Sequence, residues 1–476
     1  MTAPSDFLAA LAAIVGEAHV LRDAQTLAPY CTDWRGRYHG AALAAVLPAS
    51  TQEVAAIVRA SAAHRVPIVP QGGNTSLCGA SVPAAEAPRA IVLNTARMNR
   101  ILAVDAENNT LTAQAGCTLA AAQQAAREAG RLFALSLASE GSCQLGGNLS
   151  TNAGGIQVLR YGNARELTLG LEVVLADGQI WDGLRALRKD NTGYDLKQLF
   201  IGAEGTLGII TAAVLKLHPL PTARAVGWLA LESPSAALAL LHFLRGHFAE
   251  RISAFELIGQ SALELVARHI PRARPPFAPA AHPWSVYLEL ADAGQSEELA
   301  DRLTAACADA LARGLIRDAA LPDTLAGMDA LRALRENISE AQKREGISIK
   351  HDISLPISRI PAFLDEAQHM LRARWPQLRI VCFGHLGDGN LHYNLSLADA
   401  TANAALLAQE AAIHQAVHDL VSAHHGSISA EHGLGQLKRH AIARYKSPLE
   451  LALMRTLKQT LDPHNLMNPG KVLPDA

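Results

Sequence analysis

Apolar positions in the first half of the chain alternate between helical spacing and short continuous runs. Val54, Ile57 and Val58 form one helical face after Ser50, which predicts a helix with a Ser50–Glu53 capping box. Helices are also predicted over 5–15 and 118–129, the second closed by Gly130. Apolar runs predict strands at 66–69, 90–94, 110–115, 167–176, 179–181 and 206–217. Asp177-Gly178 predicts a type I′ hairpin turn between the fourth and fifth of these strands.

A proline-rich step at Pro219–Pro221 precedes a second pattern of strand–helix units typical of an α+β fold. Its predicted strands cover 225–231, 252–258, 284–291 and 347–353, with a hairpin at 379–397. Its predicted helices cover 234–245, 260–269, 295–313, 326–344, 359–373 and 402–424. We therefore expect an α+β protein with three segments, residues 1–222, 223–425 and 426–476.

Composition narrows the class of partner. The 476 residues are 49% hydrophobic and 18% charged, which is globular, and 42 Lys and Arg against 44 Asp and Glu leave a net charge of −2. That balance gives no general attraction for nucleic acid or anionic membrane, so we expect a small-molecule partner. Six cysteines without a C-x-x-C pair exclude a disulfide-dense scaffold. No long uncharged apolar run and no basic N-terminal region occur, so we expect a cytoplasmic protein without a transmembrane segment.

Three glycine-dense segments are candidates for binding a phosphate-containing cofactor. They begin at Pro70, Gly141 and Gly202, and their backbone N–H groups can converge on an anion such as a pyrophosphate. Neither the G-x-G-x-x-G nor the G-x-x-x-x-G-K-[ST] motif is present, which argues against a Rossmann or P-loop site. Ordinary tight turns remain the alternative interpretation.

Histidines and carboxylates gather in two later glycine-rich segments. His385 and His392 flank the turn Gly387-Asp388-Gly389-Asn390, so a hairpin can bring both imidazoles to its neck, with Asn394 on the face of His392. Glu431 and His432 follow in the second segment. Two histidines and a carboxylate can bind zinc, manganese or iron(II), although a lone histidine is more often a surface or core residue.

Three polar residues are candidates for holding a substrate carboxylate. Arg335 and Ser339 are four apart on a predicted helix and can share a face, and Lys350 lies on the following predicted strand. Taken singly, each basic residue is more often a solvated surface charge.

The glycine segments, together with Arg160-Tyr161-Gly162 and Asp190–Leu196, resemble the FAD-binding domain of the vanillyl-alcohol-oxidase (PCMH-type) flavoproteins. The resemblance extends from about residue 45 to 474, and it is strongest to the D-2-hydroxyacid dehydrogenases, in particular the D-2-hydroxyglutarate dehydrogenases. It implies a PCMH-type domain of two α+β subdomains over 1–222, an antiparallel-sheet cap domain over 223–425, and a C-terminal helical segment that returns to the flavin.

The resemblance also implies FAD bound non-covalently, since no His or Cys matches an attachment position. Cys78 and Cys143 are expected to be packing residues. Ser76 and Ala80 stand where many relatives have glycine, which is costly only where φ is positive. The residues implied to contact FAD are Pro70, Gln71, Gly72, Gly73, Asn74, Thr75, Ser76, Gly141, Ser142, Gly146, Gly147, Asn148, Thr151, Asn152, Gly154, Gly155, Glu204, Gly205, Ile209 and Asn468.

The family further implies a divalent metal on His385, His392 and Glu431, with zinc as the first choice and manganese or iron(II) as alternatives. His432 is implied as the base that takes the substrate hydroxyl proton, with a fourth metal ligand as its alternative role. Substrate contacts are implied for Arg335, Ser339, Lys350, Asn394 and His432.

The implied reaction oxidises D-2-hydroxyglutarate to 2-oxoglutarate, with hydride transfer from C2 to flavin N5. Because no nicotinamide fingerprint is visible, an electron-accepting flavoprotein or a quinone is expected as acceptor. A homodimer is also expected. The alternatives are a D-lactate or glycolate dehydrogenase subunit of the same fold, a metal-dependent hydrolase, and a flavin-binding partner without catalysis.

Overall fold

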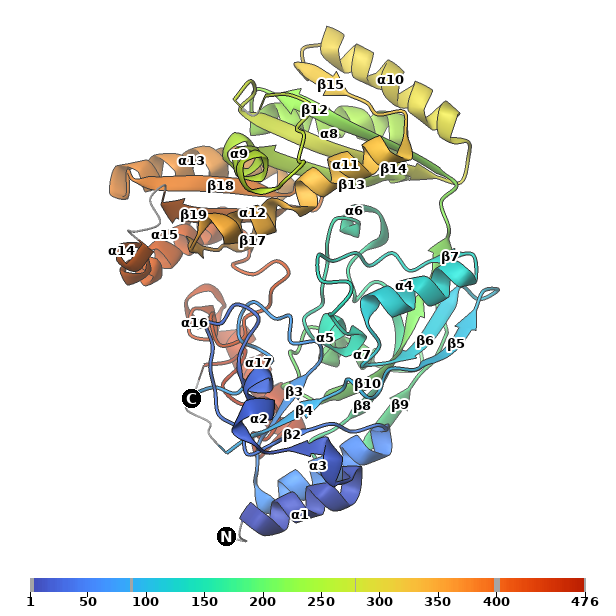
Figure 1. Cartoon of the computed structure of the whole chain (residues 1–476), viewed down its shortest axis with the longest axis vertical. Helices are drawn as coiled ribbons and strands as arrows, with labels where there is room; N and C mark the ends of the chain where they lie inside the picture. Colours follow the sequence, from blue (N-terminus) through green and yellow to red (C-terminus); the bar gives the residue numbers. More distant parts are fainter. Residues whose placement is uncertain (1–3, 86–88, 279, 398–402, 475–476) are drawn as a thin grey trace. The chain divides into compact units, whose positions relative to one another are not determined.

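A computed structural model of the chain describes residues 4–85, 89–278, 280–397 and 403–474. It divides into two compact units. Unit 1 comprises residues 1–154, 162–220 and 431–476, and unit 2 comprises residues 155–161 and 221–430. Both units combine helices with sheets, so the predicted α+β class is confirmed (Figure 1).

Unit 1 contains a small, mostly parallel sheet near its N-terminus. Its strands follow the order β1-β2-β4-β3, in which only the β1–β2 pair is antiparallel. Phe7, Leu11, Ile57 and Ile68 are among the buried side chains that join this sheet to two helices. The strands are β1 (Val20–Leu21), β2 (Ala45–Val46), β3 (Ile68–Gln71) and β4 (Ile91–Asn94), and the helices are α1 (Pro4–Val15) and α3 (Thr51–His64).

A five-stranded antiparallel sheet forms the second layer of unit 1, in the order β5-β6-β10-β8-β9. Its strands are β5 (Ile101–Asp105), β6 (Thr110–Gln114), β8 (Thr168–Val174), β9 (Ile180–Gly183) and β10 (Ile209–Lys216). A two-stranded ladder joins β7 (Arg131–Leu132) and β11 (His218–Pro219). The other helices are α2 (Ala24–Cys31), α4 (Leu119–Glu128), α5 (Leu145–Ser150), α7 (Lys197–Phe200), α16 (Ile442–Tyr445) and α17 (Pro448–Leu461).

Two local predictions in unit 1 need correction. Ser50 caps α3 as expected, but the Glu53 carboxylate accepts from the Ala49 N–H and not from that of Ser50. The β8–β9 hairpin is present, but only Gly178 has positive φ (79°), and its N–H donates to the Leu175 carbonyl. A type I′ turn needs positive φ at both central residues, so the predicted turn type is wrong.

Unit 2 is built on an eight-stranded sheet in which every pair of strands is antiparallel. The order is β15-β12-β14-β13-β18-β19-β16, and β17 also pairs with β19. The strands are β12 (Ala223–Leu231), β13 (Ile252–Gly259), β14 (Trp284–Asp292), β15 (Asp318–Ala320), β16 (Ser348–Ile349), β17 (Asp352–Ser354), β18 (Leu378–His385) and β19 (Asn390–Leu397).

Helices cover both faces of this sheet (Figure 1). One face packs on α8 (Pro234–Phe248), α10 (Ser296–Ala312), α13 (Ile360–Arg374) and α15 (Glu410–Ala423). The opposite face packs on α9 (Gln260–His269), α11 (Leu325–Glu336) and α12 (Ile338–Glu345). The short helices α6 (Val158–Tyr161) and α14 (Asn403–Ala408) complete the unit.

Three predicted elements of unit 2 are interrupted. The helix expected over 326–344 is divided at Asn337 into α11 and α12. The strand expected over 347–353 is divided at Lys350 and His351. The helix expected over 402–424 is divided into α14 and α15, and residue 402 lies outside the described residues.

Candidate active site

The three glycine segments of unit 1 contact one another. A Cβ on Gly73 would lie 1.9 Å from the Ser142 carbonyl oxygen, so only glycine fits where the first segment crosses the second. Gly205 has a φ of 71°, and a Cβ there would lie 3.0 Å from Pro70, where the third segment meets the first. The segments therefore form one continuous surface of closely packed backbone.

Two side chains that were predicted to contact FAD form hydrogen bonds with other residues of unit 1. The Gln71 amide donates to the Tyr30 and Ser81 carbonyls, and it accepts from Asn94. Asn74 has a φ of 52° and donates to the Pro29 and Thr32 carbonyls. These two amides position the loop, which leaves its backbone as the surface suited to a ligand.

The remaining predicted FAD residues of unit 1 lie on the same segments. Ser76 and Ala80 are not among the residues with positive φ, whereas Gly79 is, so the missing glycines cause no backbone strain there. Gly146, Gly147 and Asn148 lie in α5 and not in a turn, and Gly155 belongs to unit 2. Ile209 begins β10, and Gly72, Thr75, Gly141, Ser142, Thr151, Asn152 and Gly154 lie in the connecting loops.

Cys78 and Cys143 are both buried, and neither forms a disulfide with another described residue. Burial raises the pKa of the Cys143 thiol, so it is uncharged at neutral pH and acts as a packing group.

Glu204 links the third glycine segment to the segment that follows His432. Its carboxylate accepts from the N–H groups of Leu434 (2.7 Å) and Gly435 (2.9 Å), and burial raises its pKa. Asn468, with φ of 43°, donates its amide to the carbonyls of Ala80 and Glu204. The C-terminal segment is thereby fixed to the glycine segments.

Two buried ammonium groups beside Glu204 are suited to an anionic ligand. Lys438 and Lys471 are each 3% exposed, and neither Nζ has a hydrogen-bond partner among the described residues. Burial lowers the pKa of Lys471 to about 8. A buried ammonium without a partner is costly unless an anion joins it, so unit 1 fits a phosphate-bearing cofactor such as FAD.

In unit 2, the predicted hairpin is formed by β18 and β19. Phe383 pairs with His392 across it, and the rings of His385 and His392 are 5.8 Å apart between centroids. Gly389 in the turn has a φ of 92°, and a Cβ there would lie 2.3 Å from the Leu355 carbonyl oxygen. Glycine at this position thus lets the turn bring the two imidazoles together.

A buried carboxylate, Glu256 on β13, supports this pair. Its Oε1 lies 2.5 Å from Nδ1 of His385, and its Oε2 accepts from Nε of Arg335 at 2.6 Å. Burial alone would raise the pKa of Glu256, but the charges and hydrogen bonds of His385 and Arg335 bring it to about 2. A carboxylate on one nitrogen fixes the imidazole ring and leaves the other nitrogen available to a metal ion.

A second buried carboxylate, Asp352 on β17, lies near His392. Its Oδ1 lies 4.0 Å from Nδ1 of His392 and accepts from the Asn390 amide, while its Oδ2 accepts from the Ala430 N–H. Since Glu431 follows Ala430 directly, Asp352 fixes the residue that precedes this predicted ligand.

The predicted substrate residues of unit 2 are not all in the same environment. Arg335 is buried and bonded to Glu256, whereas Ser339 is exposed, and Asn337 divides the predicted helix between them. Asn394 is buried and donates to Gln342. Lys350 is half-buried between β16 and β17.

Sequence reasoning missed Glu256, Asp352, Lys438 and Lys471. A charged residue inside an apolar segment could have indicated such a buried group. Glu256 interrupts the apolar run Ala254–Ile258, but the sequence does not show which residues Glu256 contacts.

Two family models cover most of the chain. Residues 42–183 match the FAD binding domain, and residues 220–472 match the C-terminal domain of FAD linked oxidases. Among the described residues, no helix is long and apolar enough to cross a membrane.

Curated relatives align along nearly the whole chain. The mitochondrial D-2-hydroxyglutarate dehydrogenase of Bos taurus is 40% identical over 98% of this chain and 84% of its own length. The D-2-hydroxyglutarate dehydrogenase of Xanthomonas citri pv. viticola is 41% identical over 93% of this chain and 92% of its own length.

Solved structures share the fold at lower identity. A p-cresol methylhydroxylase with substrate bound superposes with a TM-score of 0.77 at 18% identity, covering 99% of this chain and 97% of that one. An alkyldihydroxyacetonephosphate synthase gives 0.73 at 20% identity, over 98% and 85% of the two chains. With the family models and the curated relatives, these likenesses show that the chain belongs to the FAD-linked oxidases of the PCMH-type superfamily and is an oxidoreductase homologous to D-2-hydroxyglutarate dehydrogenases.

Proposed function

We propose that this chain oxidises D-2-hydroxyglutarate to 2-oxoglutarate with FAD and a divalent metal ion. The observation that carries the proposal is the near-full-length identity of about 40% to relatives named for this substrate. The buried group of Glu256, Arg335 and His385 supports the proposal. Arg335 is a cation that can bind a substrate carboxylate, and Glu256 also orients the His385 imidazole.

The glycine segments of unit 1, with Asn468, Lys438 and Lys471, are the residues proposed to hold FAD. His385, His392 and Glu431 are proposed to hold the metal ion, with zinc the first choice. When bound, FAD accepts a hydride and a divalent ion lowers the pKa of an oxygen ligand.

The chain's own groups would bind the substrate and move its proton. Glu256 holds the His385 ring so that Nε2 keeps its lone pair, and His432 in its neutral form accepts the hydroxyl proton. Coordination of the metal is the alternative role of His432.

Arg335 and Lys350 are proposed to bind the distal carboxylate of the substrate. A guanidinium has five N–H donors, so the bond from Nε of Arg335 to Glu256 leaves donors for a second carboxylate. Asn394 and Ser339 are proposed as further polar contacts. Electrons would then pass to an electron-accepting flavoprotein or a quinone.

The substrate proposal is tested by anaerobic mixing of the flavin-loaded protein with a panel of D-hydroxy acids. D-2-Hydroxyglutarate is expected to bleach the flavin at lower concentration than D-malate, D-lactate or glycolate. Preferential bleaching by D-lactate or glycolate would contradict the substrate assignment and would favour the monocarboxylate alternative.

Lys350→Ala tests the carboxylate contact, with exposed Lys343→Ala as the matched control. A hydrogen bond to a charged group contributes about 1.5–3 kcal/mol, so the half-saturating D-2-hydroxyglutarate concentration should rise about 10- to 100-fold in Lys350→Ala alone. Equal behaviour of the two variants would remove Lys350 from the site.

Removal of divalent ions with a chelator tests the metal. Flavin reduction by D-2-hydroxyglutarate should be lost while the flavin stays bound, and it should return when Zn²⁺, Mn²⁺ or Fe²⁺ is added. Undiminished reduction in metal-free protein would contradict metal dependence.

A further inference from the structure

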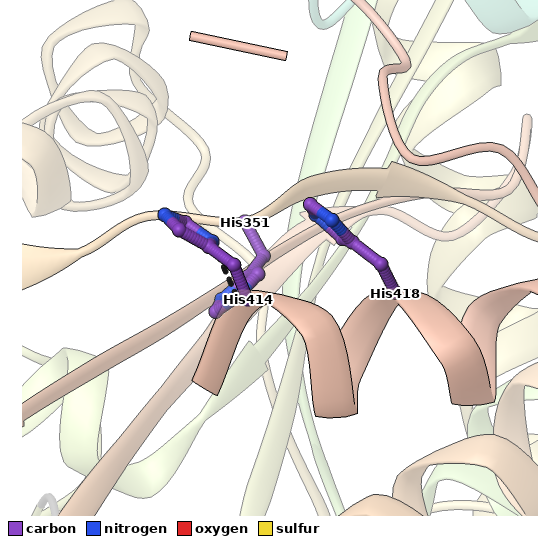
Figure 2. A group of neighbouring side chains, drawn as sticks. All are labelled: His351, His414 and His418. Atoms are coloured by element: carbon purple, nitrogen blue, oxygen red, sulfur yellow. Dashed lines mark hydrogen bonds between the residues drawn. The ribbon is translucent and has the colours of Figure 1, made fainter. Parts of the chain in front are cut away.

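Three histidines of unit 2 meet on the face of the sheet that α15 covers. His414 and His418 are four residues apart and project from the same side of α15, and His351 reaches them from the link between β16 and β17 (Figure 2). His351 is fully buried and His418 is 4% exposed, while His414 is half-buried. The helix and the sheet thus enclose three imidazoles.

The imidazoles are spaced as ligands of one ion would be. One ring nitrogen from each lies within 4.8 Å of the other two, and Nδ1 of His414 is 3.0 Å from Nε2 of His351. Two ligands of a tetrahedral zinc ion lie about 3.3 Å apart, since each Zn–N bond is about 2.0–2.1 Å. Small side-chain shifts would therefore bring these nitrogens to coordinating positions.

This group is separate from the candidate active site. Side chains alternate between the two faces of a strand, and Asp352 pairs with His392 while Ile353 pairs with Leu391. His351 therefore shares the face of Ile353, which packs on α13 and α15. His392 and Asp352 point to the opposite face, so the sheet lies between the two histidine groups.

Hydrogen bonding orients the rings of His351 and His414, and a buried ring nitrogen of His414 has no hydrogen-bond partner among the described residues. Nδ1 of His351 donates to the Tyr393 carbonyl at 2.9 Å, so its Nε2 carries a lone pair. Nδ1 of His414 must then be the donor to that lone pair, which makes Nε2 of His414 an acceptor. This Nε2 is buried and has no hydrogen-bond partner among the described residues.

A bound cation would satisfy these nitrogens. Binding of the ion to Nδ1 of His414 would move the ring proton from Nδ1 to Nε2. That Nε2 lies 3.6 Å from Oε1 of Glu410. A carboxylate behind a coordinating imidazole is the usual support of a metal-bound histidine.

We propose that His351, His414 and His418 form a second transition-metal site, suited to Zn²⁺ or a similar imidazole-preferring ion. Because two of its three ligands are almost completely buried, the ion is structural and joins α15 to the link between β16 and β17. His351 lies between Lys350 and Asp352, so the ion would also hold two residues of the candidate active site in position.

The test uses tag-free protein, because an affinity tag of histidines would bind metal itself. Zn²⁺ is titrated by calorimetry into metal-free wild type and into a His414→Gln, His418→Gln double variant. A His369→Gln variant, which removes an exposed histidine of α13, is the control. The double variant should bind one equivalent fewer than the wild type and the control. Equal stoichiometry in all three proteins would overturn the proposal.

Two further measurements distinguish a lost ligand from a misfolded variant. Zn²⁺ should raise the unfolding temperature of the wild type by more than that of the double variant, and the metal-free proteins should have similar circular-dichroism spectra. Glu410→Gln keeps all three ligands and should weaken Zn²⁺ binding about 10- to 100-fold. Unchanged affinity in Glu410→Gln would contradict its supporting role, and an equal Zn²⁺-induced shift in both proteins would count against the site.

The stoichiometry difference does not depend on the proposed activity. If D-2-hydroxyglutarate does not reduce the flavin of the wild type, the proposed function fails. The difference of one Zn²⁺ equivalent between the wild type and the double variant would still show that the second site exists. If the flavin is reduced and no equivalent is missing, only the second site fails.

Discussion

Replacing Glu256 is expected to destabilise unit 2 more than any exposed charge substitution. Glu256 is completely buried and is the shared partner of Arg335 and His385. Glu256→Gln keeps the side-chain volume but removes the negative charge, so the buried guanidinium of Arg335 loses its counter-charge. Breaking a buried ion pair in this way costs about 3–5 kcal/mol.

The expected loss can be compared with an exposed pair of the same chemistry. Glu340 bonds to Arg344 one helical turn along α12, with both side chains about half exposed, and such a pair contributes about 0.3–0.5 kcal/mol. Glu340→Gln is therefore the matched control. For a domain the size of unit 2, 3–5 kcal/mol corresponds to a fall of about 6–20 °C in unfolding temperature.

Urea unfolding of both variants, followed by circular dichroism and tryptophan fluorescence, measures the difference. The unfolding midpoint of Glu256→Gln should fall well below that of Glu340→Gln with a similar m-value. The variant should also bind Zn²⁺ about 10- to 100-fold more weakly at the site of His385, which loses its carboxylate partner. A free energy of unfolding for Glu256→Gln within about 1 kcal/mol of that of the control would refute the assignment of a buried ion pair.

Two further perturbations concern the cofactor surface of unit 1. Gly73→Ala places a Cβ against the Ser142 carbonyl, so purified protein should retain less flavin than wild type; full flavin content would contradict the close contact. Lys471→Met should stabilise the FAD-free protein at pH 7 and weaken FAD binding, as measured by unfolding and by flavin titration. The pKa of Lys471 is about 8 in the folded protein, below its usual value of 10.5. Between pH 8 and pH 10.5, Lys471 is therefore protonated in the unfolded chain but largely deprotonated in the folded one. Stability of the wild type should therefore rise from pH 8 to 10.5, by at most about 3 kcal/mol, and Lys471→Met should lack this rise. Identical dependence of stability on pH in the wild type and in Lys471→Met would refute the lowered pKa of Lys471.

The sequence predicts best the features that depend on neighbouring residues. The hairpin of β18 and β19 follows from two apolar runs around Gly387-Asp388-Gly389-Asn390, and the structure forms it. The break between α11 and α12 at Asn337 was not predicted, because the apolar spacing of the helix continues across it. In the structure the side-chain amide of Asn337 donates to the Ala333 carbonyl. The predicted joint contact of Arg335 and Ser339 with the substrate therefore spans two helices and stays a prediction.

Contacts between distant segments could not be predicted. Glu256 precedes His385 by 129 residues, and only the order of strands in the sheet places β13 beside β18. The same limit applies to His351 and His414, which the sheet and α15 bring together. Local patterns identify chemically suitable residues, whereas the topology decides which of them meet.

The most direct test of the proposed function is a single anaerobic turnover. Metal-loaded, flavin-loaded protein is mixed with excess D-2-hydroxyglutarate, and both reduced flavin and 2-oxoglutarate are quantified. We expect one molecule of 2-oxoglutarate for each flavin reduced, and no reaction of the L-enantiomer. Flavin that stays oxidised in the presence of the D-acid would contradict it.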